Sequence, residues 1–302
     1  MIGRIVFGTR GSPLALFQTD SVISKLKVLY PDILYKRKVI KTQGDKDQDS
    51  SLNLMEELGL FSNEIQSELV KNNIDAAVHS LKDVPVEHSE DLFLAAIPER
   101  VDAKDVLYHP EGLSINDLPT GSVVGTCSLR RRGQIRYLRK DVVIKDIRGN
   151  IQTRIDKVHT GEYDATILAA AGLIRLGYDI SKYYVFDFDE ITPAPGQGAL
   201  AVETRRYDKK LIEIISQIDN LNIRKAVEVE RRILQHIGAS CSVPVGVFAT
   251  STEDGLNIVA CHVNPNTGDK IVVRRQKLKG KTKEIAEAIS DKLLSSVYEN
   301  IC

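Results

Sequence analysis

Short apolar runs alternate with segments of helical period through about the first 217 residues of the chain. The apolar runs predict strands over 5–7, 35–40, 76–80, 92–97, 123–124, 142–147 and 165–169. Polar capping residues followed by helical spacing predict helices that begin at Ser12, at Ser62 or Asn63, at Ser128 and at Asn150. This alternation of strand and helix predicts two blocks, each a mainly parallel sheet covered by helices.

The first predicted helix has a clear start and an expected buried face. Ser12 suits the N-cap, and Pro13 suits the first turn because its missing N–H would have no partner there. Five apolar residues then fall roughly on one face, which we expect to be buried: Leu14, Phe17, Val22, Leu26 and Leu29.

The pattern changes in the last third of the chain. A helix is predicted over 222–237 and is ended by Gly238, three strands follow over 243–250, 256–263 and 270–276, and a helix over 285–297 closes the chain. The sequence therefore predicts an α/β protein with two βα domains and a C-terminal α+β domain that contains a three-stranded antiparallel sheet.

Charge and cysteine content narrow the function classes. The 302 residues hold 41 Lys and Arg against 41 Asp and Glu, and a general nucleic-acid or membrane-surface binder would show a basic excess. No apolar run suits a secretion signal or a membrane span. None of the four cysteines forms a C-x-x-C pair, so we expect no metal site, reduced thiols and a cytoplasmic location; they are Cys127, Cys241, Cys261 and Cys302.

Several arginines directly follow predicted strands, at the junctions where helices begin. In open α/β sheets ligands bind beyond the carboxyl ends of the strands, and helix N-termini there offer free N–H groups to anions. A single arginine at such a place is usually a solvated surface residue. Repetition in both blocks instead indicates a shared site for carboxylates, formed by Arg10, Arg130, Arg131, Arg148 and Arg154.

Lys82 and Asp83 stand between a predicted strand and the Val84-Pro85 pair. Such a dipeptide is most often a surface ion pair of little consequence. At the end of a strand and near arginines, the carboxylate could instead stabilise a developing cation and move a proton.

Two further segments have competing interpretations. Cys241 is predicted in a loop between helix and strand, where it is either a small buried hydrophobe or a nucleophile or covalent anchor. Residues 195–201 match the dinucleotide fingerprint G-x-G-x-x-A, but a proline-rich stretch precedes them and a β-like run follows. A crossing between domains is the better interpretation.

Together these segments resemble the porphobilinogen deaminase family, also called hydroxymethylbilane synthases, over nearly the whole chain. The Cys241 loop is one of the matching motifs. The others are Thr-Arg-Gly-Ser-Pro-Leu-Ala-Leu at 9–16, His-Ser-Leu-Lys-Asp-Val-Pro at 79–85, Gly-Thr-Cys-Ser-Leu-Arg-Arg at 125–131, Arg-Gly-Asn at 148–150, Gly-Glu-Tyr-Asp-Ala at 161–165 and Pro-Gly-Gln-Gly-Ala at 195–199.

The resemblance implies two domains like those of periplasmic binding proteins and a third that carries a cofactor cysteine. On this sequence the expected boundaries are 1–98 with 198–217, 99–197, and 218–302. It also implies the reaction: four porphobilinogen molecules are joined head to tail, with loss of ammonia, into hydroxymethylbilane. The growing chain is held on a dipyrromethane cofactor, and each ring carries an acetate and a propionate, which would explain the arginines.

The resemblance also assigns roles to individual residues. Asp83 matches the catalytic carboxylate, and Cys241 matches the thioether attachment site of the dipyrromethane. Cofactor binding is implied for Lys82, Ser128, Arg130, Arg131, Arg148 and Gly149. Substrate binding is implied for Arg10, Ser12, Arg148, Arg154, Arg175 and Gln197. The expected protein is a monomer that could hand its product to a uroporphyrinogen-III synthase.

One region departs from the family pattern. The family usually has Lys-Gly-Leu-Phe after its mobile loop, whereas this chain has Leu-Gly-Leu-Phe at 58–61 and Asn63 where a second lysine is common. The chief competing class is a non-catalytic anion-binding protein on the same two-lobed fold, which would explain the arginines but not Asp83 and Cys241 together. A nucleic-acid binder is disfavoured by the zero net charge.

Overall fold

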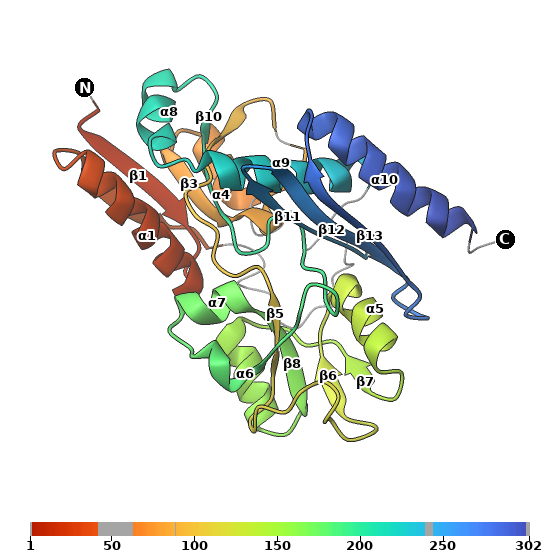
Figure 1. Cartoon of the computed structure of the whole chain (residues 1–302). Coiled ribbons are helices and arrows are strands. Elements are labelled where there is room, and N and C mark those ends of the chain that lie inside the picture. The colour runs from red at the N-terminus through yellow and green to blue at the C-terminus, as the bar shows by residue number, and fades with distance from the viewer. Residues whose placement is uncertain (1, 42–62, 88, 239–243, 300–302) are drawn as a thin grey trace. The chain divides into compact units, whose positions relative to one another are not determined.

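A computed structural model describes residues 2–41, 63–87, 89–238 and 244–299 (Figure 1). The chain forms two compact units: unit 1 is Met1–Val101 with Ala199–Arg224, and unit 2 is Asp102–Gly198 with Lys225–Cys302. Unit 2 contains both the second and the third sheet. The three-domain division expected from the sequence stays a prediction.

Unit 1 is built on one five-stranded sheet in the order β2-β1-β3-β10-β4. Its strands are β1 (Arg4–Thr9), β2 (Leu34–Val39), β3 (Ala76–Ser80), β4 (Leu92–Ala96) and β10 (Leu200–Arg205). Strands β1, β2 and β3 are parallel, whereas β10 runs antiparallel to both β3 and β4. The prediction of a mainly parallel sheet is thus confirmed, with one reversed strand. The helical segments are α1 (Pro13–Leu29), α4 (Asn63–Val70), η1 (Leu81–Asp83) and α8 (Lys209–Ser216).

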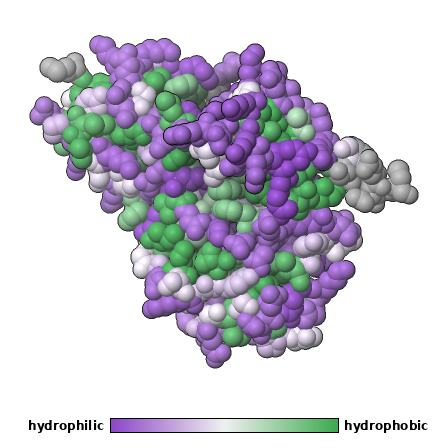
Figure 2. Space-filling view, viewed as in Figure 1, coloured by the Kyte–Doolittle hydropathy of each residue, from purple (hydrophilic) through white to green (hydrophobic). Residues whose placement is uncertain are grey.

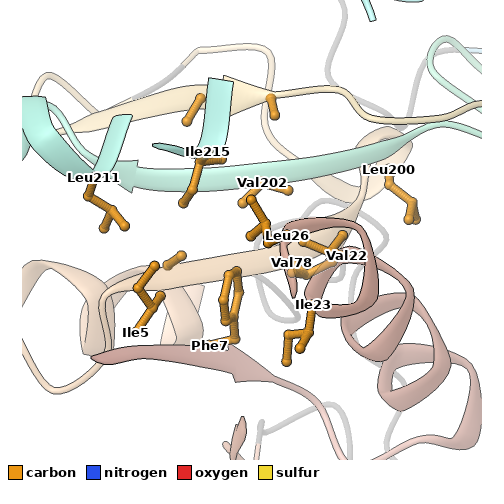
Figure 3. Packing of buried hydrophobic residues seen from close by; sticks show 13 residues of the cluster. Ile5, Phe7, Val22, Ile23, Leu26, Val78, Leu200, Val202, Leu211 and Ile215 are labelled. Atoms are coloured by element: carbon orange, nitrogen blue, oxygen red, sulfur yellow. The ribbon is translucent and has the colours of Figure 1, made fainter. Parts of the chain in front are cut away.

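Both faces of the sheet are largely buried at the central strands β1 and β3, as expected for parallel strands with helical crossovers, whereas the edge strand β2 is mostly exposed. Figure 3 shows α1 residues such as Val22 and Leu26 packed against Phe7 of β1 and Val78 of β3. The opposite face packs on α4. The predicted buried face of α1 was partly wrong: Phe17 and Leu29 are each 48% exposed.

Unit 2 repeats the same arrangement in the order β7-β6-β8-β5-β9. The strands are β5 (Asp105–Tyr108), β6 (Val123–Gly125), β7 (Val143–Lys145), β8 (Ala165–Ala169) and β9 (Tyr184–Val185). Here β5 is the reversed strand, antiparallel to β8 and β9. The helical segments are α5 (Leu129–Leu138), α6 (Ile151–His159), α7 (Ala170–Arg175) and η2 (Ile180–Lys182). Side chains of α5 join the core on one face of the sheet, and those of α6 and α7 join the core on the other.

The C-terminal part of unit 2 holds the predicted antiparallel sheet. Its strands are β11 (Val245–Thr252), β12 (Gly255–Val263) and β13 (Lys270–Leu278), and its helices are α9 (Leu221–His236) and α10 (Thr282–Glu299). Helix α10 packs on β12 and β13. Glu230 of α9 is fully buried and accepts hydrogen bonds from the N–H groups of Gly196 and Ala249, both at 2.7 Å. This carboxylate therefore ties α9 to β11 and to the segment before β10.

The visible surface is mostly polar. Figure 2 shows hydrophilic residues over much of the visible surface, with smaller patches of hydrophobic residues among them. Within the described part of the chain, no helix is long and apolar enough to span a membrane.

Candidate functional site

In unit 1 the carboxyl ends of β1 and β3 bring two predicted groups to one edge of the sheet. Arg10 and Ser12 follow β1, and Lys82 and Asp83 follow β3; because these strands are parallel neighbours, their ends lie together. Ser12 accepts a hydrogen bond from the N–H of Ala15 at 3.3 Å, which starts α1 as the sequence predicted. This edge therefore presents two cations and one carboxylate.

A short 3-10 turn sets the position of Asp83. Leu81 at its start is fully buried and donates its N–H to the carbonyl of Ala199 at 2.9 Å. Val84 after it is also buried and closes the turn on the carbonyl of Leu81. Because these two side chains anchor the turn, Lys82 and Asp83 between them stay half-buried, with part of each side chain accessible.

Behind this turn lies a buried ionisable pair that the sequence did not predict. His79 Nε2 lies 3.1 Å from Glu203 Oε2, and the Glu203 side chain is fully buried. Gln66 Nε2 donates to both oxygens of that carboxylate, at 3.0 and 3.2 Å. The pair joins the end of β3 to the reversed strand β10, next to the turn that carries Asp83.

In unit 2 the carboxyl ends of β6, β7 and β8 gather most of the predicted arginines. Ser128 accepts from the N–H of Arg131 at 3.4 Å and caps α5; Asn150 accepts from the N–H of Thr153 at 2.9 Å and caps α6. Both helices therefore begin at the same edge of the sheet, with their N–H groups toward it. The arginines near this edge are Arg130, Arg131, Arg148, Arg154 and Arg175.

The centre of this edge is a carboxylate that sequence reasoning missed. Asp105, the first residue of β5, is fully buried and forms ion pairs with Arg130 Nη2 at 2.9 Å and Arg131 Nη2 at 2.7 Å. Burial by itself raises the pKa of Asp105, but the two guanidiniums outweigh burial and hold that pKa well below its usual range. The sequence gives one weak signal for this role, an aspartate that opens the apolar run Val106–Tyr108.

Two more predicted residues are buried beside this cluster. Gln197 donates from Nε2 to Asp105 Oδ1 at 2.9 Å and to the carbonyl of Ala103 at 2.7 Å. Arg175, 6% exposed, donates from Nη2 to the carbonyl of Gly198 at 2.9 Å. Both side chains thus contact segments next to the points where the chain enters and leaves unit 2. The glycine-rich stretch leads into strand β10 and not into a helix, which contradicts the dinucleotide interpretation. The chain passes from unit 2 to unit 1 between Gly198 and Ala199, which supports the crossing interpretation.

Arg148 and Arg154 lie around a left-handed glycine. Gly149 has φ +107°, and an added Cβ would lie 2.5 Å from Thr153 Cγ2. Arg154 donates from Nε to the Gly149 carbonyl at 2.8 Å. Glycine is needed here because the turn between β7 and α6 leaves no room for a side chain.

Other predicted residues fall outside the described part of the chain. These are Cys241, Cys302 and the run at 58–61. Of the remaining cysteines, Cys261 is buried and Cys127 is half-buried, and both are free thiols. Within the described ranges, no group of three or more His, Cys, Asp or Glu residues could hold a metal ion.

Two family profiles together match most of the chain. Residues 5–213 match the family profile described as porphobilinogen deaminase, dipyromethane cofactor binding domain, and residues 224–297 match the porphobilinogen deaminase C-terminal domain. Among solved structures, the methionine-binding protein MetQ aligns with a TM-score of 0.45 and 12% identity over 72% of this chain and 89% of that one.

Full-length relatives agree with the profile matches. A porphobilinogen deaminase of Shouchella clausii is 46% identical over 254 residues, which cover 83% of this chain and 81% of that one. One from Limosilactobacillus reuteri is 39% identical over 297 residues, which cover 98% and 97% of the two chains. The chain therefore belongs to the porphobilinogen deaminase family.

Proposed function

We propose that this protein is a hydroxymethylbilane synthase that condenses four porphobilinogen molecules head to tail, with release of ammonia, in tetrapyrrole biosynthesis. Family membership supports the reaction class. The structural observation that carries the proposal is the row of arginines at the carboxyl edge of the second sheet in a chain of zero net charge. A substrate and product rich in acetate and propionate groups require such local cations.

The described residues fit the dipyrromethane cofactor that the family profile names. The Nε–H of Arg131 is buried and has no hydrogen-bond acceptor among the described residues, so it is a donor available to a carboxylate. When bound, the dipyrromethane supplies the pyrrole carbon at which the chain begins to grow. We assign its attachment to Cys241, and its contacts to Lys82, Ser128, Arg130, Arg131, Arg148 and Gly149.

The substrate carboxylates would be bound by a second set. These are Arg10, Ser12, Arg148, Arg154, Arg175 and Gln197. We assign proton transfer and charge stabilisation to Asp83. A carboxylate stabilises the cation that develops on a pyrrole as ammonia leaves, and it can accept the pyrrole proton afterwards. The neighbouring Lys82 supplies a cation on the same turn.

Denatured mass measurement on the purified protein tests this function. The enzyme should exceed its sequence mass by two pyrrole units, and it should convert porphobilinogen to hydroxymethylbilane. A non-catalytic anion-binding protein of the same fold would show the sequence mass and no conversion. That result would overturn the proposal.

Four finer properties belong to the same proposal. We expect the protein to be a monomer. We also expect it in the cytoplasm, since the two described cysteines, Cys127 and Cys261, are both free thiols. We also expect a transient handover of the linear product to a uroporphyrinogen-III synthase. The division into domains at 1–98 with 198–217, 99–197 and 218–302 is retained as part of this proposal.

Replacement of Gly149 by Ala should reduce both stability and turnover. Strain at positive φ costs about 1–3 kcal/mol, and the clash with Thr153 would shift the turn that carries Arg148. Gly161, after the other end of α6, is a matched control because its φ is +76° but an added Cβ would meet nothing within 4 Å. Gly161→Ala should lower the unfolding temperature while turnover stays normal. Equal turnover in both variants would contradict a role for the Gly149 turn.

A further inference from the structure

The buried carboxylate of Asp105 divides its two oxygens between two arginines. Oδ2 faces Arg130 Nη2 at 2.9 Å, and Oδ1 faces Arg131 Nη2 at 2.7 Å. The two arginines are 6% and 7% exposed, so all three side chains are nearly removed from solvent. Neighbouring positions on a helix point about 100° apart, yet both guanidiniums converge on this one group.

Each guanidinium has a second, independent anchor. Arg130 donates from Nη1 to the carbonyl of Thr192 at 2.7 Å, and Arg131 donates from Nη1 to the carbonyl of Ile167 at 2.9 Å. A planar guanidinium held at two of its nitrogens has a fixed plane. The two cations are therefore oriented by the protein itself, before any ligand arrives.

The cluster also has a defined charge. The guanidiniums keep the pKa of Asp105 far below neutrality, so its carboxylate is ionised at working pH. Two arginines and one carboxylate leave a single net positive charge in this buried place. The growing product is a polyanion and must later be released. One net positive charge attracts it less strongly than two unpaired guanidinium charges would.

Asp105 further connects the arginines to the crossing segments of unit 2. It lies opposite Ala169 in the sheet, at the same edge as the carboxyl ends of the parallel strands. Gln197 bonds to Asp105 Oδ1 and to the Ala103 carbonyl, which joins the entering segment to the leaving one. Within the described part of the chain, Asp105 forms an ion pair with each of the two arginines.

We propose that Asp105 is a positioning residue of the reaction: its buried carboxylate fixes the orientation of Arg130 and Arg131 and reduces their joint charge to one. This inference rests on the proposed function, in which the two arginines hold the carboxylates of the dipyrromethane. Because Asp105 is fully buried, we assign its effect to the two arginines and not to direct contact with a ligand.

Asp105→Asn is the direct test, with Asp141→Asn as matched control. Asp141 also takes two nitrogens of an arginine, Arg139, in the same unit, but at the exposed surface. Turnover is measured per cofactor-loaded molecule, counted by denatured mass. Because an amide has one acceptor oxygen, one arginine loses its side-chain anchor and keeps only its backbone carbonyl, and we expect kcat to fall about 10- to 100-fold. KM for porphobilinogen should rise by less than about threefold, or should fall. Loss of the carboxylate charge makes the cluster more positive, which strengthens the binding of an anionic substrate. The control should match the wild type in both.

A second pair of variants keeps the test valid if Asp105→Asn does not fold. Asp105→Glu retains the charge and displaces the carboxylate by one methylene, so it should retain cofactor but turn over at least about tenfold more slowly per loaded molecule. Asp105→Glu should lower kcat less in an Arg131→Leu protein than it does in the wild type, because the part of its effect that passes through Arg131 is already lost.

The opposing outcome is equally clear. Both variants could lower only the fraction of protein that is folded and cofactor-loaded, while kcat and KM per loaded molecule stay normal. If Asp105→Glu behaves in this way, and Asp105→Asn does so where it folds, Asp105 is merely structural and the inference is wrong. If the wild type itself carries no pyrrole mass and no turnover, the proposed function fails instead.

Discussion

A Cys241→Ala protein is expected to have the plain sequence mass and no turnover at all. The proposed thioether needs a nucleophilic sulfur, and an alanine methyl group cannot form that bond. Without the covalent primer, the chain has no anchored point from which four substrate units can be added. The measurements are denatured mass and porphobilinogen consumption, made on the same preparation.

The remaining cysteines supply the controls. Cys127→Ala and Cys261→Ala should each keep the pyrrole mass and normal turnover. Cys261 is fully buried, with its Sγ 3.5 Å from Gln134 Oε1, so the smaller alanine side chain should cost about 1 kcal/mol of stability. We expect the same retention of cofactor in Cys302→Ala. A Cys241→Ala protein that keeps its mass excess would move the attachment site elsewhere.

Asp83→Asn should give a folded, cofactor-loaded enzyme whose kcat is about 10²- to 10³-fold lower, the usual loss when a preorganised charge is removed. The structure explains why folding should survive. Leu81 and Val84 are buried and hold the turn, whereas Asp83 is half-buried between them. Asparagine keeps the size and hydrogen-bonding capacity of the side chain but cannot stabilise a cation or accept its proton.

Glu87→Gln is the matched control for this substitution. Glu87 is an exposed carboxylate four residues further along the same segment, so its replacement removes one charge and should leave turnover unchanged. Thermal unfolding and the mass excess should be alike in both variants. If the kcat of Asp83→Asn equalled that of the wild type, another group would have to transfer the proton and stabilise the cation.

The parts of the fold that depend on neighbours in sequence were predicted correctly. Ser12, Ser128 and Asn150 each cap the helix they were assigned, because an N-cap side chain bonds an N–H only two or three residues away. The order of strands and helices in both blocks, and the antiparallel tail, followed from periodicity for the same reason. The strand β5 and the helix α8 were missed.

The buried face of α1 shows where local pattern was insufficient. The sequence favoured Phe17 and Leu29, yet Gln18 and Thr19 are buried in their place. Gln18 is buried because its amide bonds Ser80, a residue 62 positions away. A polar residue can lie in a core when a distant partner satisfies it, and hydrophobic period contains no information about that partner.

The chain by itself determined where the arginines lie, at the ends of strands and starts of helices, and the chemistry they suit. Only the tertiary structure determined what holds two of them: Asp105 is 26 residues from Arg131 and 92 from Gln197. It also decided that β5 and β10 run against their neighbours. Strand direction and buried ion pairs depend on which distant segments pack together, and that choice is made by burial of the whole sheet, not by any short stretch of residues.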